Sequence, residues 1–564
     1  MTDNSNTVHT IPELWRQTVS RHADLDAIKM RGEPAVTYAE VERRSAAMAR
    51  GLVERGAGKG SRIGLLLPNG PDWLVGWLAA SRIGAIPVAL STLFSARELR
   101  HVIRNADLSV VMMAKAFLRN DYVARMEEAF PGIVMAKAAT GPLSLVDAPY
   151  LREVWTTERA GAAWTSGTID DLEHLGEASP LATRELLAAQ EEQVSPADLG
   201  LLIYTSGSTS YPKGILHTQG VIVRKTIYCG DVNTLYPSNL ERGDRAIVPS
   251  PFFWVGGFLT LTCALYRGAC IIVDPDMSAV AMVRAIRSEK ATLAGFTPSQ
   301  HKQMESLEDC TPELLAGLKP LNPIQRQILN TDPSVPTKQI PSVMGMTETL
   351  APHSGEPDGA LLPPDMAGSV GRPLNGMERK LIDPETGEPV EFGQPGELCV
   401  RGWTLMEGMY KRERSEVFDA DGFYHTGDLC EERGDRHLFF HSRLGGMIKT
   451  SGANVSPDEV EEVIREAAGV VEAAVFGVPD EALGHLLAAV VATDGRTDLD
   501  EAFLKGWVKE RLSSFKVPRK VIVCRYEDIP RTGTDKIHKP GVLERFGPLI
   551  AGGSRATGER PEKG

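Results

Sequence analysis

The segment YTSGSTSYPKG at residues 204–214 is the most informative part of this chain. Hydroxyl side chains and a glycine crowd the positions from Thr205 to Thr209, and Lys213 follows four residues later. A glycine turn brings backbone N–H groups close to a ligand, and hydroxyls add further donors. Successive amides in such a turn form a concavity for anions, to which Lys213 adds a full positive charge. These features predict a phosphate-binding loop.

The residues before this segment support that prediction. The apolar run from Leu201 to Ile203 is typical of a buried strand, which would anchor the loop. The spacing of the Walker A motif is absent. Taken alone, the segment is equally compatible with an ordinary surface loop.

Composition limits what the protein can be. The chain has 564 residues, 42% of them hydrophobic, so roughly three or four domains with large cores are expected. A net charge of −13 argues against nucleic-acid binding, and any phosphate site must be a local positive pocket. The cysteines, seven in number, show no metal-binding spacing and are expected as free thiols in a reducing cytoplasm. The longest apolar stretch, 252–266, is too short for a membrane span, so we expect no transmembrane segment.

Residues 60–135 alternate apolar runs with helical patterns, which predicts layers of parallel strands and helices. Residues 135–195 are less regular and are expected to form a surface excursion. The expected strands are 62–67, 85–90 and 108–113, and the expected helices are 72–83 and 96–105.

The pattern changes twice towards the C-terminus. Short strands with Gly and Pro turns predict a β-rich subdomain over 368–440, and near Arg443 a small α+β module begins, with Ser456 and Glu459 as a capping box. The fold class is therefore α/β, with a small α+β C-terminal domain. The predicted domains are residues 1–444, a C-terminal domain at 445–548 and a disordered tail at 549–564.

Three further motifs carry chemistry. Glu348 in GMTE (345–348) places a carboxylate beside a hydroxyl, which suits magnesium and phosphate. Asp428 in YHTGD (424–428) follows a glycine turn and can accept both hydroxyls of a ribose. PRTGTDK (530–536) ends on a lysine. Each motif alone has a simpler interpretation, namely a solvated Glu, an ordinary hairpin or a solvated Lys.

In this order and at these separations, the four motifs resemble the adenylate-forming superfamily, and within it the acyl-CoA synthetase branch. The resemblance extends over about residues 10–545, with support from LPN (67–69), SRIGAIPV (81–88), GEL (396–398) and GANVSP (452–457). It implies a large N-terminal domain and a small mobile C-terminal lid. It also implies two half-reactions. A carboxylate attacks the α-phosphate of ATP and releases pyrophosphate, and the thiol of coenzyme A then displaces AMP.

The resemblance assigns a role to each motif. It implies that the ATP triphosphate is held by Thr205, Ser206, Gly207, Ser208, Thr209 and Lys213, that Met344, Gly345 and Met346 also contact the nucleotide, and that Thr347 lies near the α-phosphate. It further implies Glu348 as the Mg²⁺ ligand, Asp428 and Arg443 at the ribose, Lys536 at the reacting oxygens, Gly445 as hinge, and Lys449, Ser451 and Gly452 at coenzyme A. Four positions depart from the family pattern: Ser210, Trp254, Met344 and Asp535.

The expected substrate pocket is apolar and bulky. It comprises Phe253, Trp254, Phe258, Gly295, Phe296 and Thr297. No carboxylate lies there to pair an ammonium, so a hydrophobic carboxylic acid is expected rather than a free amino acid. The alternative is that these aromatics belong to the ordinary core.

Coenzyme A is the preferred acceptor, because no carrier domain is attached and 452–457 matches CoA ligases. Two alternatives remain, which are transfer to an acyl-carrier protein and a nucleotide-binding pseudoenzyme. The oligomeric state is open, with a homodimer among the options.

Overall fold

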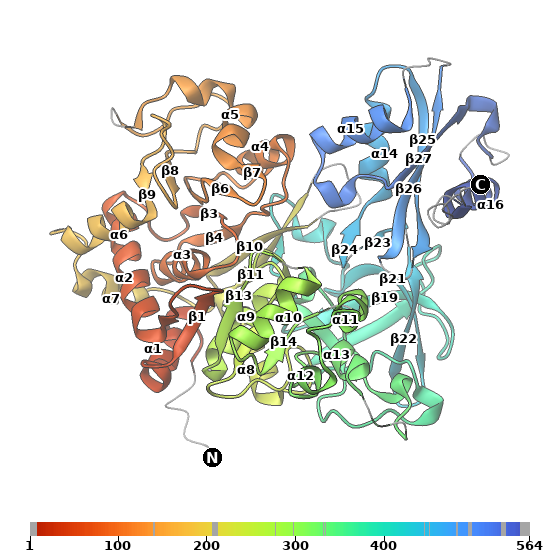
Figure 1. Ribbon diagram of the computed structural model, residues 1–564, viewed down its shortest axis with the longest axis horizontal. Coiled ribbons are helices and arrows are strands. Elements are labelled where there is room, and N and C mark those ends of the chain that lie inside the picture. Colours follow the sequence, from red (N-terminus) through yellow and green to blue (C-terminus); the bar gives the residue numbers. More distant parts are fainter. Residues whose placement is uncertain are drawn as a thin grey trace, which may run out of the picture. The chain divides into compact units, whose positions relative to one another are not determined.

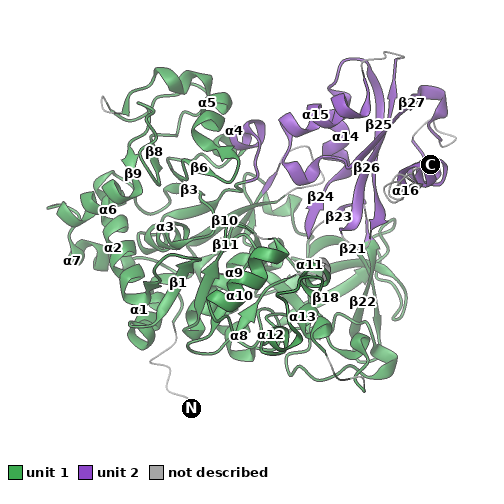
Figure 2. Ribbon diagram, viewed as in Figure 1, with its two compact units in different colours: residues 1–92, 102–205, 214–442 green, residues 93–101, 206–213, 443–564 purple. Residues whose placement is uncertain are grey.

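The computed structural model describes residues 8–138, 141–205, 212–276, 278–296, 298–330, 332, 334–444, 446–450, 452–480, 483–494, 499–531 and 537–552. The chain divides into two compact units (Figure 2). Unit 1 comprises residues 1–92, 102–205 and 214–442, and unit 2 comprises 93–101, 206–213 and 443–564.

The largest sheet of unit 1 has eight strands, and every described pairing from β10 to β9 is parallel. Its central strands are buried along their whole length, as expected for a parallel sheet covered on both faces. In spatial order the strands are β20 (Gly408–Met409), β11 (Lys213–Thr218), β10 (Leu199–Thr205), β4 (Ile86–Ala89), β3 (Arg62–Leu66), β5 (Val110–Met113), β8 (Glu153–Thr156) and β9 (Gly167–Thr168).

A second sheet of five strands lies in the same unit. The strands β14, β12, β13 and β1 are parallel, and β2 pairs antiparallel with β1. The spatial order is β14 (Leu293–Ala294), β12 (Arg245–Ile247), β13 (Cys270–Val273), β1 (Asp26–Met30) and β2 (Val36–Thr37).

The helix α3 (Pro71–Arg82) connects the two sheets. It contacts β3 and β4 of the larger sheet as well as β1 of the smaller one (Figure 1). Every residue from Trp73 to Arg82 is buried, which explains why this segment is apolar almost all round rather than on one stripe. The layered α/β organisation predicted for residues 60–135 is confirmed.

The described part of the chain up to residue 330 contains further helices. They are α1 (Ile11–His22), α2 (Tyr38–Glu54), α4 (Ala96–Asn105), α5 (Tyr122–Ala129), α6 (Ile169–Ala178), α7 (Arg184–Glu192), α8 (Gln219–Val232), α9 (Val255–Arg267), α10 (Ala279–Ser288), α11 (Pro298–Glu305), α12 (Pro312–Ala316) and α13 (Pro323–Ile328). None of the described helices is both long enough and apolar enough to cross a lipid bilayer.

Residues 135–195 are better integrated than the sequence predicts. The strands β8 and β9 extend the eight-stranded sheet, and α6 packs closely on α2. The apolar pattern fails here because β8 buries polar side chains. Glu153 is 4% exposed and pairs with Arg55 and with the indole N–H of Trp155. A buried carboxylate that is paired interrupts the apolar run by which a strand is recognised in the sequence.

The β-rich subdomain predicted over 368–440 is confirmed, and its strands begin slightly earlier. A three-stranded sheet contains β15 (Met344–Met346), β16 (Ala351–Gly355) and β17 (Arg372–Pro373). A four-stranded sheet contains β18 (Met377–Ile382), β19 (Gly396–Gly402), β21 (Tyr424–Arg433) and β22 (His437–Arg443). A two-stranded ribbon, β6 (Ala116–Phe117) with β7 (Asn120–Asp121), is attached elsewhere in unit 1.

Unit 2 contains the predicted α+β module. Its sheet comprises β24 (Ala453–Val455), β23 (Ile448–Thr450), β26 (Gly484–Thr493), β25 (Val470–Asp480) and β27 (Lys520–Arg525), which pairs with β26. The helices are α14 (Pro457–Arg465), α15 (Glu501–Arg511) and α16 (Lys539–Gly552). One apolar core joins α14 and α15 to β25 and β26.

A buried ion cluster also lies within unit 2. The ammonium of Lys516 binds the Glu98 carboxylate at 2.7 Å and the Glu459 carboxylate at 2.8 Å, and none of the three side chains is more than 2% exposed. Burial raises the pKa of Glu459 to about 7. Ser456 caps α14 as predicted, but the Glu459 carboxylate binds Lys516 instead of completing the capping box.

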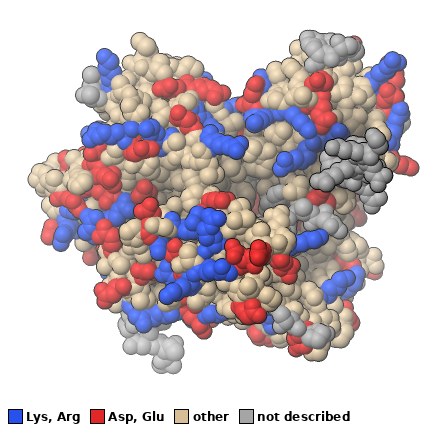
Figure 3. Space-filling view, viewed as in Figure 1, with Lys and Arg blue, Asp and Glu red and all other residues tan. Residues whose placement is uncertain are grey.

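Basic and acidic side chains are interspersed on the face shown in Figure 3. A site for a polyphosphate on such a surface has to be built locally from a few convergent groups.

Candidate functional site

The MGMTE segment forms a strand and a tight turn. β15 ends at Met346, and a single 3₁₀ turn runs from Thr347 to Thr349. Gly345 pairs with Pro352 on β16, and a Cβ atom at Gly345 would lie only 2.3 Å from the carbonyl carbon of Ala351. Only glycine therefore allows the two strands to approach this closely.

The backbone after this turn is strained. Leu350 and Ala351 have φ angles of 48° and 69°, in the left-handed region that costs such residues about 1–3 kcal/mol each. The hydroxyl of Thr349 is fully buried and donates to the Ala351 carbonyl oxygen at 2.7 Å. The surrounding structure thus fixes where the Thr347 and Glu348 side chains begin.

Two neighbours hold the carbonyl groups of these residues. The Nε2 atom of His217 lies 2.7 Å from the carbonyl oxygen of Thr347, and the Met406 N–H donates to that of Glu348 at 2.7 Å. His217 is fully buried, and burial lowers its pKa to about 4, so the ring is neutral near pH 7. Because a carbonyl can only accept, Nε2 carries the proton.

The carboxylate of Glu348 is oriented by a tyrosine. The Tyr424 hydroxyl, at the start of β21, donates to Oε1 of Glu348 at 3.3 Å. Both side chains are half-buried. A carboxylate beside the Thr347 hydroxyl offers the hard oxygen ligands that Mg²⁺ takes, so the donor set fits this ion.

The TGD segment is a bulge within β21, paired with β19, rather than the glycine turn expected from the sequence. The Thr426 hydroxyl donates to the Leu398 carbonyl oxygen at 2.8 Å and accepts the Asp428 N–H at 3.1 Å. Gly427, with a φ of 70°, donates its N–H to Glu397 at 3.1 Å. Asp428 is 1% exposed, so its carboxylate is shielded from bulk water.

Met344 is the first residue of the MGMTE motif. It packs against the cluster of Leu398, Val400, Cys430 and Leu438, with Tyr424 in the same group. The structure therefore brings the MGMTE and YHTGD motifs together in unit 1, as the family resemblance implies.

The predicted phosphate loop is described only at its two ends. Thr205 ends β10 and Lys213 begins β11, and both are half-buried. The other predicted site residues of the loop lie outside the described residues, as do several elsewhere: Ser206, Gly207, Ser208, Thr209, Ser210, Thr297, Gly445, Ser451, Asp535 and Lys536. In unit 2, Arg443 ends β22, Lys449 is exposed on β23, and Gly452 follows with a φ of 82°.

The predicted substrate aromatics differ in exposure. Phe258 is fully buried, with its ring edge-on to Trp77 at a centroid distance of 5.2 Å. Phe253 is 4% exposed. Its ring centroid lies 6.0 Å from that of Trp254, which is half-buried. Phe296 stacks on His301 at 5.6 Å, next to Gly295. The assignment of these residues to a substrate pocket stays a prediction.

Pattern analysis assigned no structural role to several residues that support the site. Asn69 accepts the Phe252 N–H at 2.7 Å and donates to the Ser250 carbonyl oxygen at 2.9 Å, so it shapes the aromatic segment. Lys225 is fully buried on α8, and its ammonium donates to the Pro352 carbonyl oxygen. Burial lowers the pKa of Lys225. In the sequence, the lysine inside the apolar helical run 221–229 could have indicated a buried ammonium group.

Comparison with known proteins identifies the family. A family model described as AMP-binding enzyme matches residues 15–410. A second model, described as AMP-binding enzyme C-terminal domain, matches residues 459–536. The chain belongs to the AMP-binding enzyme family.

Relatives of this AMP-binding enzyme match over nearly their whole lengths. A feruloyl-CoA synthase from Amycolatopsis sp is 31% identical, over 92% of this chain and 95% of that protein. The putative acyl-CoA synthetase YngI from Bacillus subtilis (strain 168) is 27% identical, over 95% and 97%. Among solved structures, the amide bond synthetase McbA from Marinactinospora thermotolerans has the same fold, with a TM-score of 0.72, 23% identity and coverage of 94% and 99%. The resemblance to the adenylate-forming superfamily, and the predicted fold class, are confirmed.

Proposed function

We propose that this AMP-binding enzyme is an ATP-dependent acyl-CoA ligase for a hydrophobic carboxylic acid. The observation that carries the proposal is the Thr347–Glu348 turn, whose carbonyl groups are held by His217 and Met406 while Tyr424 orients the carboxylate. A binding protein would not need a strained backbone next to an acid and a hydroxyl at adjacent positions.

In the first half-reaction, an oxygen of the acid attacks the α-phosphorus of ATP and pyrophosphate leaves. Thr347 orients the α-phosphate, Asp428 accepts the ribose hydroxyls, and the loop from Thr205 to Lys213 binds the β- and γ-phosphates. Magnesium held by Glu348 would neutralise charge on the leaving pyrophosphate. Lys536 donates to the reacting oxygens, a role worth about 10²–10³ in rate for one well-placed donor.

In the second half-reaction, the sulfur of coenzyme A attacks the acyl carbon, and AMP leaves with the electrons of the broken bond. We assign this step to a different orientation of the lid at residues 445–548, pivoting at Gly445, a movement that has to break the Lys516–Glu98 ion pair. Rotation there withdraws Lys536 and presents Lys449, Ser451 and Gly452. Such a hinge lets one pocket host two reactions that need different surroundings.

The acid is proposed to be hydrophobic because the expected pocket offers aromatic rings from Phe253, Trp254 and Phe296. The feruloyl-CoA synthase relative, named for an aromatic acid, favours testing aromatic acids first.

The test is pyrophosphate release with a panel of aromatic, fatty and polycyclic acids, followed by mass detection of the thioester. Release that requires one acid, with thioester formed on addition of coenzyme A, supports the proposal. Thioester formed only on a holo acyl-carrier protein supports that alternative acceptor. ATP binding without pyrophosphate release from any acid would establish the pseudoenzyme instead.

A further inference from the structure

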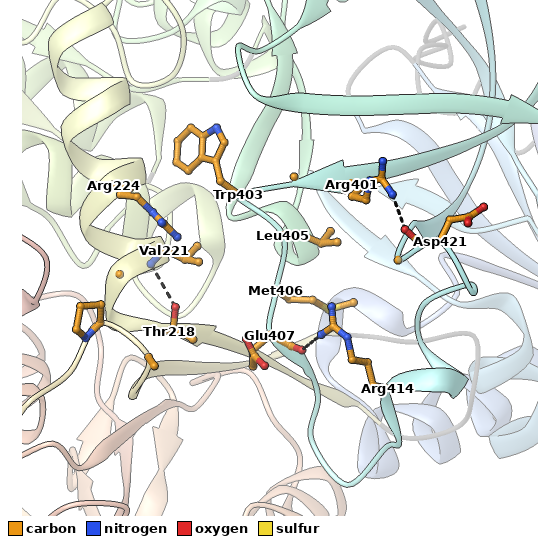
Figure 4. Close-up of a pocket in the computed structure, with 15 residues that line it drawn as sticks. Thr218, Val221, Arg224, Arg401, Trp403, Leu405, Met406, Glu407, Arg414 and Asp421 are labelled. Atoms are coloured by element: carbon orange, nitrogen blue, oxygen red, sulfur yellow. Dashed lines mark hydrogen bonds between the residues drawn. The ribbon is translucent and has the colours of Figure 1, made fainter.

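Unit 1 contains a pocket of about 730 Å³ that the proposed ligase reaction does not use. Its walls come from the first turn of α8, from the connection between β19 and β20, and from residues 414–422 (Figure 4). Among the described residues that line it, none belongs to the MGMTE or YHTGD motif. The pocket therefore has a different lining from the proposed nucleotide site, which it adjoins through Met406, whose N–H donates to the Glu348 carbonyl oxygen.

Two arginines bring uncompensated positive charge to this pocket. Arg224 extends into it from α8, is exposed, and makes no hydrogen bond or ion pair with any described residue (Figure 4). Arg414 donates to the Glu407 carbonyl oxygen at 3.1 Å and lies over the Phe418 ring, but no described carboxylate pairs with it. Arg401 contributes little, because Glu378 already neutralises it at 2.6 Å.

The acidic residues of the pocket do not cancel this charge. The carboxylate of Asp421 points away from Leu405 at the pocket's centre, and it lies 3.9 Å from the ammonium of Lys380 (Figure 4). The Glu407 carboxylate is turned away from Arg224 in the same view. The interior consequently favours an anion.

The rest of the lining is apolar. Val221, Leu405 and Met406 form the surface between the two arginines, and Trp403 is a further lining residue (Figure 4). Two guanidinium groups match the oxygens of a phosphate, and both belong to long, exposed side chains that can turn towards one ligand. An apolar surface next to them suits a ligand with an organic body.

We propose that this pocket binds a small organic phosphate, whose dianion is held by Arg224 and Arg414 and whose apolar body rests on Val221 and Leu405. The proposal stands independently of the ligase assignment, because it concerns a separate set of residues.

The test is calorimetric titration of the full chain with phenyl phosphate, in the presence of a saturating non-hydrolysable ATP analogue that occupies the nucleotide site. We expect one bound equivalent and no binding of phenol. Arg224→Gln and Arg414→Gln should each weaken the affinity at least about tenfold, as expected for a lost charge-assisted hydrogen bond. Arg119→Gln is the matched control, since Arg119 is likewise exposed and lies outside the pocket.

Absence of binding to the wild-type protein would overturn the proposal. Equal affinity of the wild type and the double variant Arg224→Gln/Arg414→Gln would do the same, as would an equal loss in Arg119→Gln. Thermal melting of each variant confirms that it is folded, which is expected because all three side chains are exposed.

Discussion

The hydroxyl of Tyr424 lies 3.3 Å from Oε1 of Glu348 and links the YHTGD motif to the MGMTE motif. In the proposed mechanism, this hydrogen bond sets the direction in which the Glu348 carboxylate meets magnesium.

Tyr424→Phe tests that role. Loss of a donor to a charged group at this length is expected to cost about 1.5 kcal/mol, so the half-activating magnesium concentration should rise roughly tenfold. Initial rates over a magnesium titration give this value. Tyr410→Phe is the control, because its hydroxyl donates to the Asp107 carboxylate at 2.9 Å. If the half-activating magnesium concentration rose equally in both variants, the proposed role of Tyr424 in orienting Glu348 would be wrong.

Gly345→Ala tests the close approach of β15 and β16. The new methyl group would stand 2.3 Å from backbone of Ala351, so the strand must move and take Thr347 with it. We expect kcat to fall by at least 10²-fold, since small misplacements of reacting groups cost this much. Gly408→Ala, where a Cβ meets nothing within 4 Å, should be neutral. Wild-type kcat in Gly345→Ala would show that the strands can adjust freely.

His217 predicts a pH dependence of stability. Burial lowers its pKa from 6.5 to about 4. Between these pH values, the imidazole is therefore protonated in the unfolded state and neutral in the folded state. The free energy of unfolding should therefore drop as pH falls from about 6.5 towards 4, by roughly 3 kcal/mol for a shift of this size. Urea unfolding at several pH values should show a smaller drop for His217→Gln. His174→Gln, an exposed control, should keep the wild-type slope. Identical slopes in all three proteins would contradict the assignment.

Lys516→Met tests the buried cluster of unit 2. The variant leaves the Glu98 and Glu459 carboxylates buried without their cation, so the free energy of unfolding should fall by about 3–5 kcal/mol at pH 8. The deficit should shrink below pH 7, where Glu459 is protonated. Lys520→Met removes a half-buried pair with Glu501, near the surface, and should cost no more than about 1 kcal/mol. A cost for Lys516→Met as small as that control would mean the cluster is unimportant.

Lys536→Ala and Lys449→Ala together test the two-step mechanism. The first should abolish adenylate formation yet leave thioester formation from a supplied acyl-adenylate largely intact. The second should show the reverse pattern. Pyrophosphate release and thioester mass measure the two steps separately. If either variant lost both steps equally, the separate roles of the lysines would be untenable.

The sequence predicted the elements whose signals are local. The helix over 96–105 was predicted with its observed bounds, and the buried strands of the parallel sheet were predicted within a few residues, because continuous apolar runs mark them. The chemistry-bearing motifs were recognisable because each combines a glycine with charged or hydroxyl side chains.

What escaped prediction depends on contacts between distant segments. His217 and Met406 meet the Thr347–Glu348 turn from positions 130 residues before and about 58 residues after it, and neither belongs to a recognisable motif. β8 escaped because its buried Glu153 is paired with a distant arginine. Side-chain partners of this kind become visible only when the chain is folded.

Glu98 is separated from Lys516 by more than 400 residues, yet both belong to the same compact unit. A fragment cut at Arg443 would retain the Lys516 ammonium and the Glu459 carboxylate but lose the second acid. Lys516 and Glu459 would then remain as a single ion pair, and the surface that residues 93–101 contact within unit 2 would become exposed to solvent. Adding residues 93–101 to such a fragment would restore the second carboxylate.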